Sequence, residues 1–128
     1  MGGASGQTTP NLSSTRGRDW ALPNKSLGST GVTRPIRIQV FSGRLVVSPE
    51  RGSGMSAKEI PVPGSMKDSV DDFIDTVWNR IDRWGMAGPS MYWKPVLNVD
   101  VYPGGELRFE ELQHLLQGSG IEIKRSNR

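Results

Sequence analysis

The chain has 128 residues, of which 34% are hydrophobic, with a net charge of +3 and no Cys. This length fits one domain, and the low apolar content means that only part of the chain can form a buried core. The lack of Cys excludes disulfides, thiol catalysis and Cys-ligated zinc. No apolar run approaches the roughly 18–20 residues of a membrane span, so we expect no direct membrane insertion.

The apolar deficit is concentrated in residues 1–33, which are rich in Gly, Ser, Thr, Pro and Asn. Such a segment buries too little surface to offset roughly 1–2 kcal/mol of backbone entropy per residue. We therefore predict a disordered tail over residues 1–33 and a folded domain over residues 34–128. Within the tail, Trp20 and Leu22 allow two interpretations: a short segment that docks on the domain or a partner, or an exposed Trp in a mobile tail.

The positive charge is located mainly in this tail. Residues 1–34 contain four basic residues and one acidic residue, and the remainder contains twelve of each. A domain with balanced charge lacks the electrostatic pattern that phosphate-backbone binding needs, so nucleic acid is an unlikely partner. Nucleic-acid binding through the basic tail stays open as an alternative function.

The first half of the domain has the pattern of three strands. Ile36, Ile38 and Val40 alternate with polar or exposed positions, and Ser42-Gly43 separates them from a second β-rich run at residues 45–47. This spacing predicts a hairpin. Residues 60–63 contain two Pro and predict a short edge strand, because each Pro removes a ladder donor.

Residues 65–84 predict the longest helix. Its apolar side chains recur at helical spacing, namely Val70, Phe73, Ile74, Val77, Ile81 and Trp84. Arg80 and Arg83 suit the negative end of the helix dipole, and Gly85 is expected to end the helix.

The last third of the domain predicts a strand, a helix and a second strand. Leu97, Val99 and Val101 alternate with polar residues, and Pro103-Gly104-Gly105 ends that strand. Helical spacing then follows from Phe109 to Leu116, and alternation resumes at residues 121–123. The whole pattern predicts an α+β domain of order ββ(short β)αβαβ. We expect a two-layer sandwich with one mixed sheet of four to five strands and two helices on one face, of split-βαβ or ferredoxin-like type.

Residues 85–94 form the least ordinary stretch, because a Gly/Pro loop here carries two Met, a Tyr and a Trp. One interpretation is that these side chains cover one end of the core. The other is a partner-binding surface, since Met and aromatic residues are favoured at adaptable interfaces. The residues of that predicted interaction surface are Met86, Met91, Tyr92, Trp93 and Lys94.

The candidates for metal binding are weak. His114 is the single His, and Glu110 and Glu111 precede it on the same helix, but a metal site needs further ligands. The run of Asp71, Asp72 and Asp75 has no resemblance to a calcium loop and is typical of a solvated helix face. We predict no metal.

The candidates for catalysis are no stronger. Asp100 and Glu106 form a carboxylate pair in principle, but we expect Asp100 on the less buried side of its strand. The glycines before residue 106 lack the spacing of phosphate-binding loops. We predict no catalytic residue, no cofactor and a protein that is not an enzyme.

Five segments carry a resemblance to a known family: Trp20-Ala21-Leu22-Pro23, Arg34-Pro35-Ile36-Arg37, Trp84-Gly85-Met86-Ala87-Gly88, Tyr92-Trp93-Lys94-Pro95-Val96-Leu97 and Gly118-Ser119-Gly120. With these segments, residues 18–125 resemble the C-terminal domain of an uncharacterised bacterial family of planctomycete type. The resemblance implies a domain that ends a longer protein. Some such proteins begin with one membrane helix and a coiled region, as the accessory subunits of proton-driven biopolymer transporters do.

These observations predict a non-enzymatic protein-interaction module whose partner is another protein. A soluble domain of a membrane-anchored transport accessory protein is the alternative that the resemblance adds. The family offers no activity and no catalytic residue to transfer to this sequence.

Overall fold

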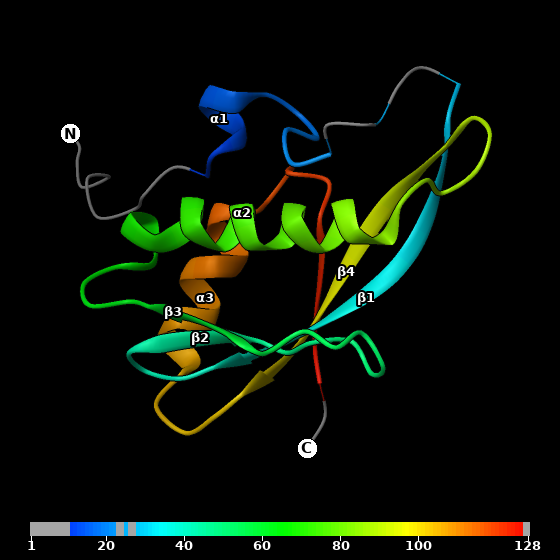
Figure 1. The fold of residues 1–128 in the computed structure, drawn as a ribbon. Coiled ribbons are helices and arrows are strands. Elements are labelled where there is room, and N and C mark those ends of the chain that lie inside the picture. Colours follow the sequence, from blue (N-terminus) through cyan, green and yellow to red (C-terminus); the bar gives the residue numbers. More distant parts are fainter. Residues whose placement is uncertain (1–10, 23–24, 26–27, 127–128) are drawn as a thin grey trace.

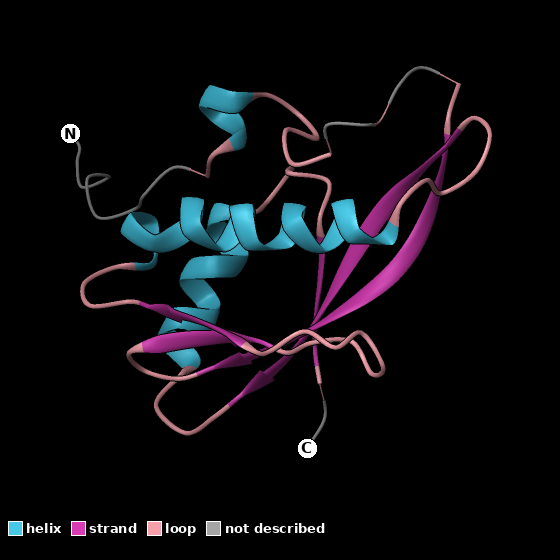
Figure 2. Cartoon of the chain, in the orientation of Figure 1, coloured by secondary structure: helices cyan, strands magenta, loops and turns pink. Residues whose placement is uncertain are grey.

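The computed structural model describes residues 11–22, 25 and 28–126. It contains one mixed sheet and three helices, arranged as the α+β domain that the sequence predicts (Figures 1 and 2). The elements in chain order are α1 (Ser13–Arg16), β1 (Thr30–Val40), β2 (Arg44–Val47), β3 (Lys58–Pro61), α2 (Met66–Trp84), β4 (Met91–Val101), α3 (Glu106–Leu115) and β5 (Glu122–Arg125).

The first three strands form an antiparallel meander. Ile38 lies opposite Val47 in the β1–β2 hairpin, and the backbone N–H of Phe41 donates to the Arg44 carbonyl at 2.9 Å to close the turn. β2 then pairs antiparallel with β3. The predicted hairpin and the short third strand are both confirmed, and β3 is an edge strand of the sheet.

The second half of the sheet is parallel. β4 pairs with β1 over its whole length, with Ile36 opposite Leu97 and Ile38 opposite Val99, and β5 pairs parallel with β4. The strand order is β3-β2-β1-β4-β5, so β1 and β4 are interior strands. Successive side chains of a strand point to opposite faces of the sheet, and helices cover only one face. The apolar residues that alternate along β1 and β4 are buried on that face.

Helices α2 and α3 supply the covering layer. In the chain α2 connects β3 to β4 and α3 connects β4 to β5, and both connections move in the same direction across the sheet. With the right-handed crossovers that such connections take, both helices fall on the same face. Their apolar stripes join the strands in one core cluster, in which Phe73, Val77 and Leu112 are fully buried. Burying a side chain of this size contributes about 1.5–3 kcal/mol.

The strand order combines one split crossover, of the kind named among the expectations, with one crossover between neighbouring strands. β4 and β5 are hydrogen-bonded neighbours, as are β1 and β4. The β4–α3–β5 unit is therefore a simple βαβ unit, whereas β2 and β1 lie between β3 and β4, the two strands that α2 connects. The two-layer sandwich itself is as predicted.

The prediction of a disordered tail over residues 1–33 needs correction for the part that the structure describes. Residues 1–10, 23–24 and 26–27 lie outside the described residues. Residues 11–22, in contrast, contain α1 and pack on the domain, and β1 begins at Thr30, before the predicted boundary at residue 34. The physical reason is tertiary contact, which a composition argument cannot detect.

The docking contacts of residues 11–22 are specific. The Ala21 N–H donates to the Ser119 carbonyl at 3.0 Å, and the Trp78 indole donates to the Ala21 carbonyl at 3.1 Å. Leu22 lies so close to Gly120 that a Cβ at residue 120 would approach its side chain to 2.4 Å. Of the two interpretations of Trp20 and Leu22, the structure therefore supports docking on the chain's own domain. We call residues 11–22 the clasp.

Candidate functional site

The predicted interaction surface is divided by the structure into an exposed part and a buried part. Met86 is 88% exposed and Met91 is 46% exposed, at the two ends of the loop between α2 and β4. Trp93 and Lys94 are half-buried. Tyr92 is only 8% exposed, so it belongs to the packed interior.

Tyr92 packs across the β1–β4 ribbon. It lies opposite Gly31 in the parallel register, and a Cβ at residue 31 would approach the Tyr92 hydroxyl oxygen to 2.9 Å. Gly31 therefore leaves room for the phenol ring. Tyr92 positions the start of β4 and is covered by the fold itself.

The exposed part surrounds a shallow hollow. It has a volume of about 240 Å³ and is lined by Gly85, Met86, Ala87, Gly88, Met91, Tyr92 and Trp93. The Trp93 indole N–H donates to the Gly85 carbonyl at 2.7 Å and ties the loop to the end of α2. We call this feature the methionine hollow.

Trp93 also belongs to a cluster that the sequence analysis did not predict. Its ring meets the ring of Trp84 edge to face, with centroids 5.4 Å apart. The Arg34 guanidinium lies 4.6 Å from the Trp84 ring centroid and 5.3 Å from that of Trp93. Such cation–π contacts and the edge-to-face pair hold the three side chains together where α2 ends above the sheet.

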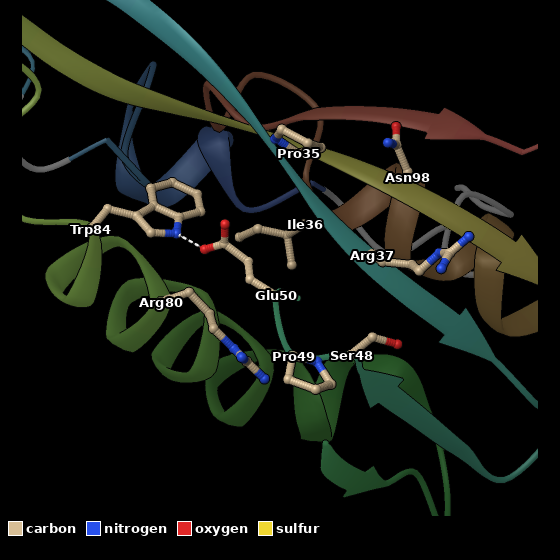
Figure 3. A pocket seen from close by; sticks show the side chains of 9 residues that line it. All are labelled: Pro35, Ile36, Arg37, Ser48, Pro49, Glu50, Arg80, Trp84 and Asn98. Carbon is tan, nitrogen blue, oxygen red and sulfur yellow. Dashed lines mark hydrogen bonds between the residues drawn. The ribbon is translucent and has the colours of Figure 1, made fainter. Parts of the chain in front are cut away.

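Glu50 is the acidic partner of this cluster. One of its carboxylate oxygens accepts hydrogen bonds from Arg34 Nη2 at 2.7 Å and from Arg34 Nε at 3.2 Å. The other oxygen accepts a hydrogen bond from the Trp84 indole N–H, drawn as a dashed line in Figure 3. The carboxylate thus joins β1, the segment after β2 and the last turn of α2.

Arg80 lies one turn before Trp84 on α2, and its guanidinium extends along the helix towards Pro49 (Figure 3). It is 3% exposed, and its Nη2 donates to the Val47 carbonyl at 3.2 Å. Its Nη1 lies 3.5 Å from the Met55 sulfur, a weak acceptor. Its Nε is buried without a hydrogen-bond partner.

Two adjoining pockets open around Arg80, Glu50 and Trp84. One has a volume of about 260 Å³ and runs under the edge of β1, where Ile36 and Pro49 line it (Figure 3). The other has a volume of about 320 Å³ and opens towards the loop at residues 51–55. Its charged lining consists of Arg34, Arg51, Arg80, Arg83 and Glu50. We call the two pockets together the arginine cleft.

The cleft shifts the pKa values of two of its groups. Burial raises the pKa of Glu50, but the hydrogen bonds from Arg34 and Trp84 and the positive charges of Arg34 and Arg80 outweigh this effect and leave it below its ordinary value. Burial lowers the pKa of Arg80, which the charge of Glu50 raises and that of Arg83 lowers further. Both shifts follow from several charges placed close together with limited access to water.

The sequence candidates for metal binding are not brought together. Asp71 forms an ion pair with Arg16 of the clasp at 2.9 Å, and Glu111 pairs with Arg108 at 2.7 Å. His114 is half-buried on α3. Among the residues that the structure describes, no group of three or more His, Asp or Glu side chains is placed to hold a metal ion.

The two members of the candidate carboxylate pair have different surroundings. Glu106 lies 4.0 Å from Arg125, and Asp100 is half-buried on β4 at a position that alternates with the core residues. Two of the three basic residues described in the tail have carboxylate partners, since Arg16 pairs with Asp71 and Lys25 pairs with Asp19 at 2.5 Å. Because the charges of Arg16 and Lys25 are partly neutralised in these pairs, the tail attracts nucleic acid less strongly.

A signal for the arginine cleft is present in the sequence. Phe73, Val77, Arg80 and Trp84 succeed one another at spacings of four, three and four residues, so Arg80 lies on the apolar stripe of α2. An Arg at such a position indicates a buried guanidinium. The contribution of Glu50 has no local signal, because it depends on how the segment after β2 folds back.

None of the helices in the described ranges combines the length and the apolar character that crossing a bilayer requires. In comparisons with protein-family models, curated proteins and solved structures, no match to this chain is found.

Proposed function

We propose that this protein is a non-enzymatic protein-binding module that contacts its partner through the methionine hollow. One observation carries the proposal. Among the described residues three large apolar side chains are exposed, Met86, Met91 and Leu107, and two of them border the same hollow. Exposed apolar groups gathered in one place are typical of interaction sites, whereas a single exposed Leu needs no explanation.

The shape and chemistry of the hollow favour one kind of occupant. Its volume of about 240 Å³ is too small for a folded element and suits one large apolar side chain of a partner segment. Flexible Met side chains adapt to such a group, and the half-buried Trp93 provides a firm wall. The partner therefore presents a Leu, Met or aromatic residue on an exposed segment.

The non-enzymatic part of the proposal rests on the residue types in the sequence. There is no Cys and a single His, and two of the candidate carboxylates, Glu106 and Glu111, lie beside Arg side chains. That the domain ends a longer bacterial protein stays a prediction of the family resemblance.

A phage-displayed library of random peptides tests the proposal on the full chain. We expect selected peptides to share an apolar residue, and the double substitution Met86→Ser and Met91→Ser to weaken their binding by about 30-fold, which corresponds to the roughly 2 kcal/mol of an interface hot spot. Both Met side chains are exposed, so the melting temperature should not change.

Leu107→Ser is the matched control, because Leu107 is 60% exposed on α3, outside the residues that line the hollow. Peptides selected on the unmodified chain should bind this variant normally. Peptides that bind the double variant as tightly as the unmodified chain would refute the proposal, as would a selection that enriches no peptide.

A further inference from the structure

The arginine cleft contains more positive charge than its single carboxylate can neutralise. Its larger pocket is lined by four Arg and one Glu. Glu50 is already engaged, because its two oxygens accept hydrogen bonds from Arg34 and from the Trp84 indole. The surplus charge therefore belongs to the other Arg side chains.

Arg51, Arg80 and Arg83 carry this surplus. None of the three takes part in the ion pairs found within the described ranges, whereas Arg16, Arg34, Arg44, Arg108 and Arg125 do. Arg51 and Arg83 are exposed, and Arg80 is buried. Arg80 thus forms the inner end of the cleft, and the other two form its mouth.

Arg80 is the most informative of these side chains. A buried guanidinium loses its hydration and normally recovers the free energy through a paired anion and a full set of hydrogen bonds. Arg80 has only a backbone carbonyl and a thioether sulfur as hydrogen-bond partners, its Nε has none, and Glu50 acts on it through its charge without a hydrogen bond. Arg80 lies on the apolar stripe of α2, where an apolar side chain would pack without losing the hydration of a charge.

We infer that the arginine cleft is an oxyanion-binding site, and that a phosphoryl group is the ligand that fits it best. Arg guanidinium groups bind phosphate and carboxylate oxygens through two parallel hydrogen bonds, and three cations outside any described ion pair favour a doubly charged anion over a singly charged one. The adjoining pockets, of about 260 and 320 Å³, have room for such a group and for what is attached to it.

The cleft walls add a preference for the rest of the ligand. Trp84 lines both pockets, and Ile36 and Pro49 line the smaller one. These side chains offer an apolar surface beside the charged one. The ligand is therefore a phosphoryl group, either free or attached to a small organic group, and this inference does not depend on the methionine hollow.

Isothermal titration of the full chain with inorganic phosphate, O-phosphoserine and acetate tests the inference. We expect saturable phosphate binding with a dissociation constant of about 1 mM or tighter, and binding of acetate at least about tenfold weaker. Tighter binding of O-phosphoserine than of phosphate would identify an attached phosphoryl group as the natural ligand, and the reverse would identify the free anion. The inference would be overturned if phosphate did not saturate the protein at about 10 mM, tenfold above the expected dissociation constant, or if acetate bound as tightly as phosphate.

Two substitutions locate the site. Arg83→Gln removes an exposed cation and should weaken phosphate binding about tenfold, the loss of one charge-assisted contact, without changing the melting temperature. Arg80→Lys keeps the charge but loses the planar fork and should weaken binding by a similar factor. Because Arg80 is buried, the melting temperature of this variant is measured in parallel.

Lys67→Gln is the matched control, since Lys67 is an exposed cation at the opposite end of the same helix. It removes the same net charge and should leave phosphate affinity unchanged. Equal weakening by Lys67→Gln and Arg83→Gln would show a non-specific charge effect and would overturn the assignment to the cleft.

Discussion

At the scale of single residues, Glu50 connects parts of the chain that are distant in sequence. It accepts hydrogen bonds from Arg34 on β1 and from Trp84 at the end of α2. Arg34 in turn lies against both Trp84 and Trp93, so one carboxylate orients a cation and two aromatic rings. Loss of the Glu50 charge should weaken the contacts between Arg34 and the two Trp rings and leave the hydrophobic core of the domain intact.

The pH dependence of stability follows from the lowered pKa of Glu50. Its ordinary value is 4.5, and its value in the folded chain is lower. The ionised carboxylate therefore stabilises the fold above about pH 4.5, and this contribution is lost as the pH falls through the folded-state pKa. We expect Glu50→Gln to lower the free energy of unfolding by up to about 1 kcal/mol at pH 7, since the ion pair is partly exposed.

Urea unfolding at a series of pH values measures this effect. The difference between the unmodified chain and Glu50→Gln should shrink as the pH falls below 4.5, because protonation then removes the same charge from Glu50. A difference that stays constant from pH 7 to pH 3 would contradict the assigned role of the carboxylate.

At the scale of elements, β4 serves two purposes along its length. Its second half contains Leu97 and Val99, which are fully buried between β1 and β5. Its first half carries Met91 and Trp93, which border the methionine hollow. A rigid interior strand thus holds one side of the proposed binding surface, and the loop after α2 holds the other.

The clasp is the second element with a clear physical role. It reaches across α2 to the segment that follows α3, through the Trp78–Ala21 hydrogen bond and the Ala21–Ser119 backbone hydrogen bond. Figure 1 shows α1 and the chain after it above α2, on the side away from the sheet. The clasp therefore covers apolar surface that the two helices leave open.

Leu22→Ala tests the contribution of the clasp. Leu22 is 6% exposed, so its truncation should lower the free energy of unfolding by about 2 kcal/mol, the low end of the range for buried Leu. Leu107→Ala is the control with the same chemical change at an exposed position, and it should alter stability by less than about 0.5 kcal/mol. Equal effects of the two substitutions in thermal melts would show that the clasp does not pack on the domain.

The elements could be predicted from the sequence because their patterns are local. The alternation at Ile36, Ile38 and Val40 and the helical spacing of Phe73 and Val77 are visible within short windows, and they are confirmed. Docking of the clasp is only one of two interpretations that the sequence allows, because it depends on contacts such as Ala21–Ser119 between residues about one hundred positions apart. The order of the strands in the sheet also stays open at the level of the sequence, because it depends on which strand edges meet in the folded chain.

At the scale of the whole molecule, the two proposed sites adjoin. Trp84 lines the arginine cleft, Trp93 lines the methionine hollow, and the two indole rings are in contact. An apolar site next to an oxyanion site lies where α2, β1 and β4 meet. One end of the sandwich thus gathers the features that favour ligand binding.

The candidate site was predictable only in part. The Met and aromatic content of residues 85–94 was evident, and Met86 and Met91 are exposed. The predicted surface includes Tyr92, which the structure buries. Composition alone does not show that Gly31 on the adjacent strand leaves room for the Tyr92 ring. The arginine cleft was missed because the zero net charge of residues 35–128 hides a local surplus that arises only when α2 packs against the segment after β2.

The most direct test of the account observes the four Trp indole N–H signals by NMR while inorganic phosphate is added to the full chain. Trp84 donates its indole proton to Glu50 within the arginine cleft, and Trp78 donates to Ala21 in the clasp. We predict that the Trp84 signal shifts most and saturates with phosphate, and that the Trp20 and Trp78 signals stay in place. A Trp84 signal that does not move, or shifts of equal size at all four indoles, would contradict the account.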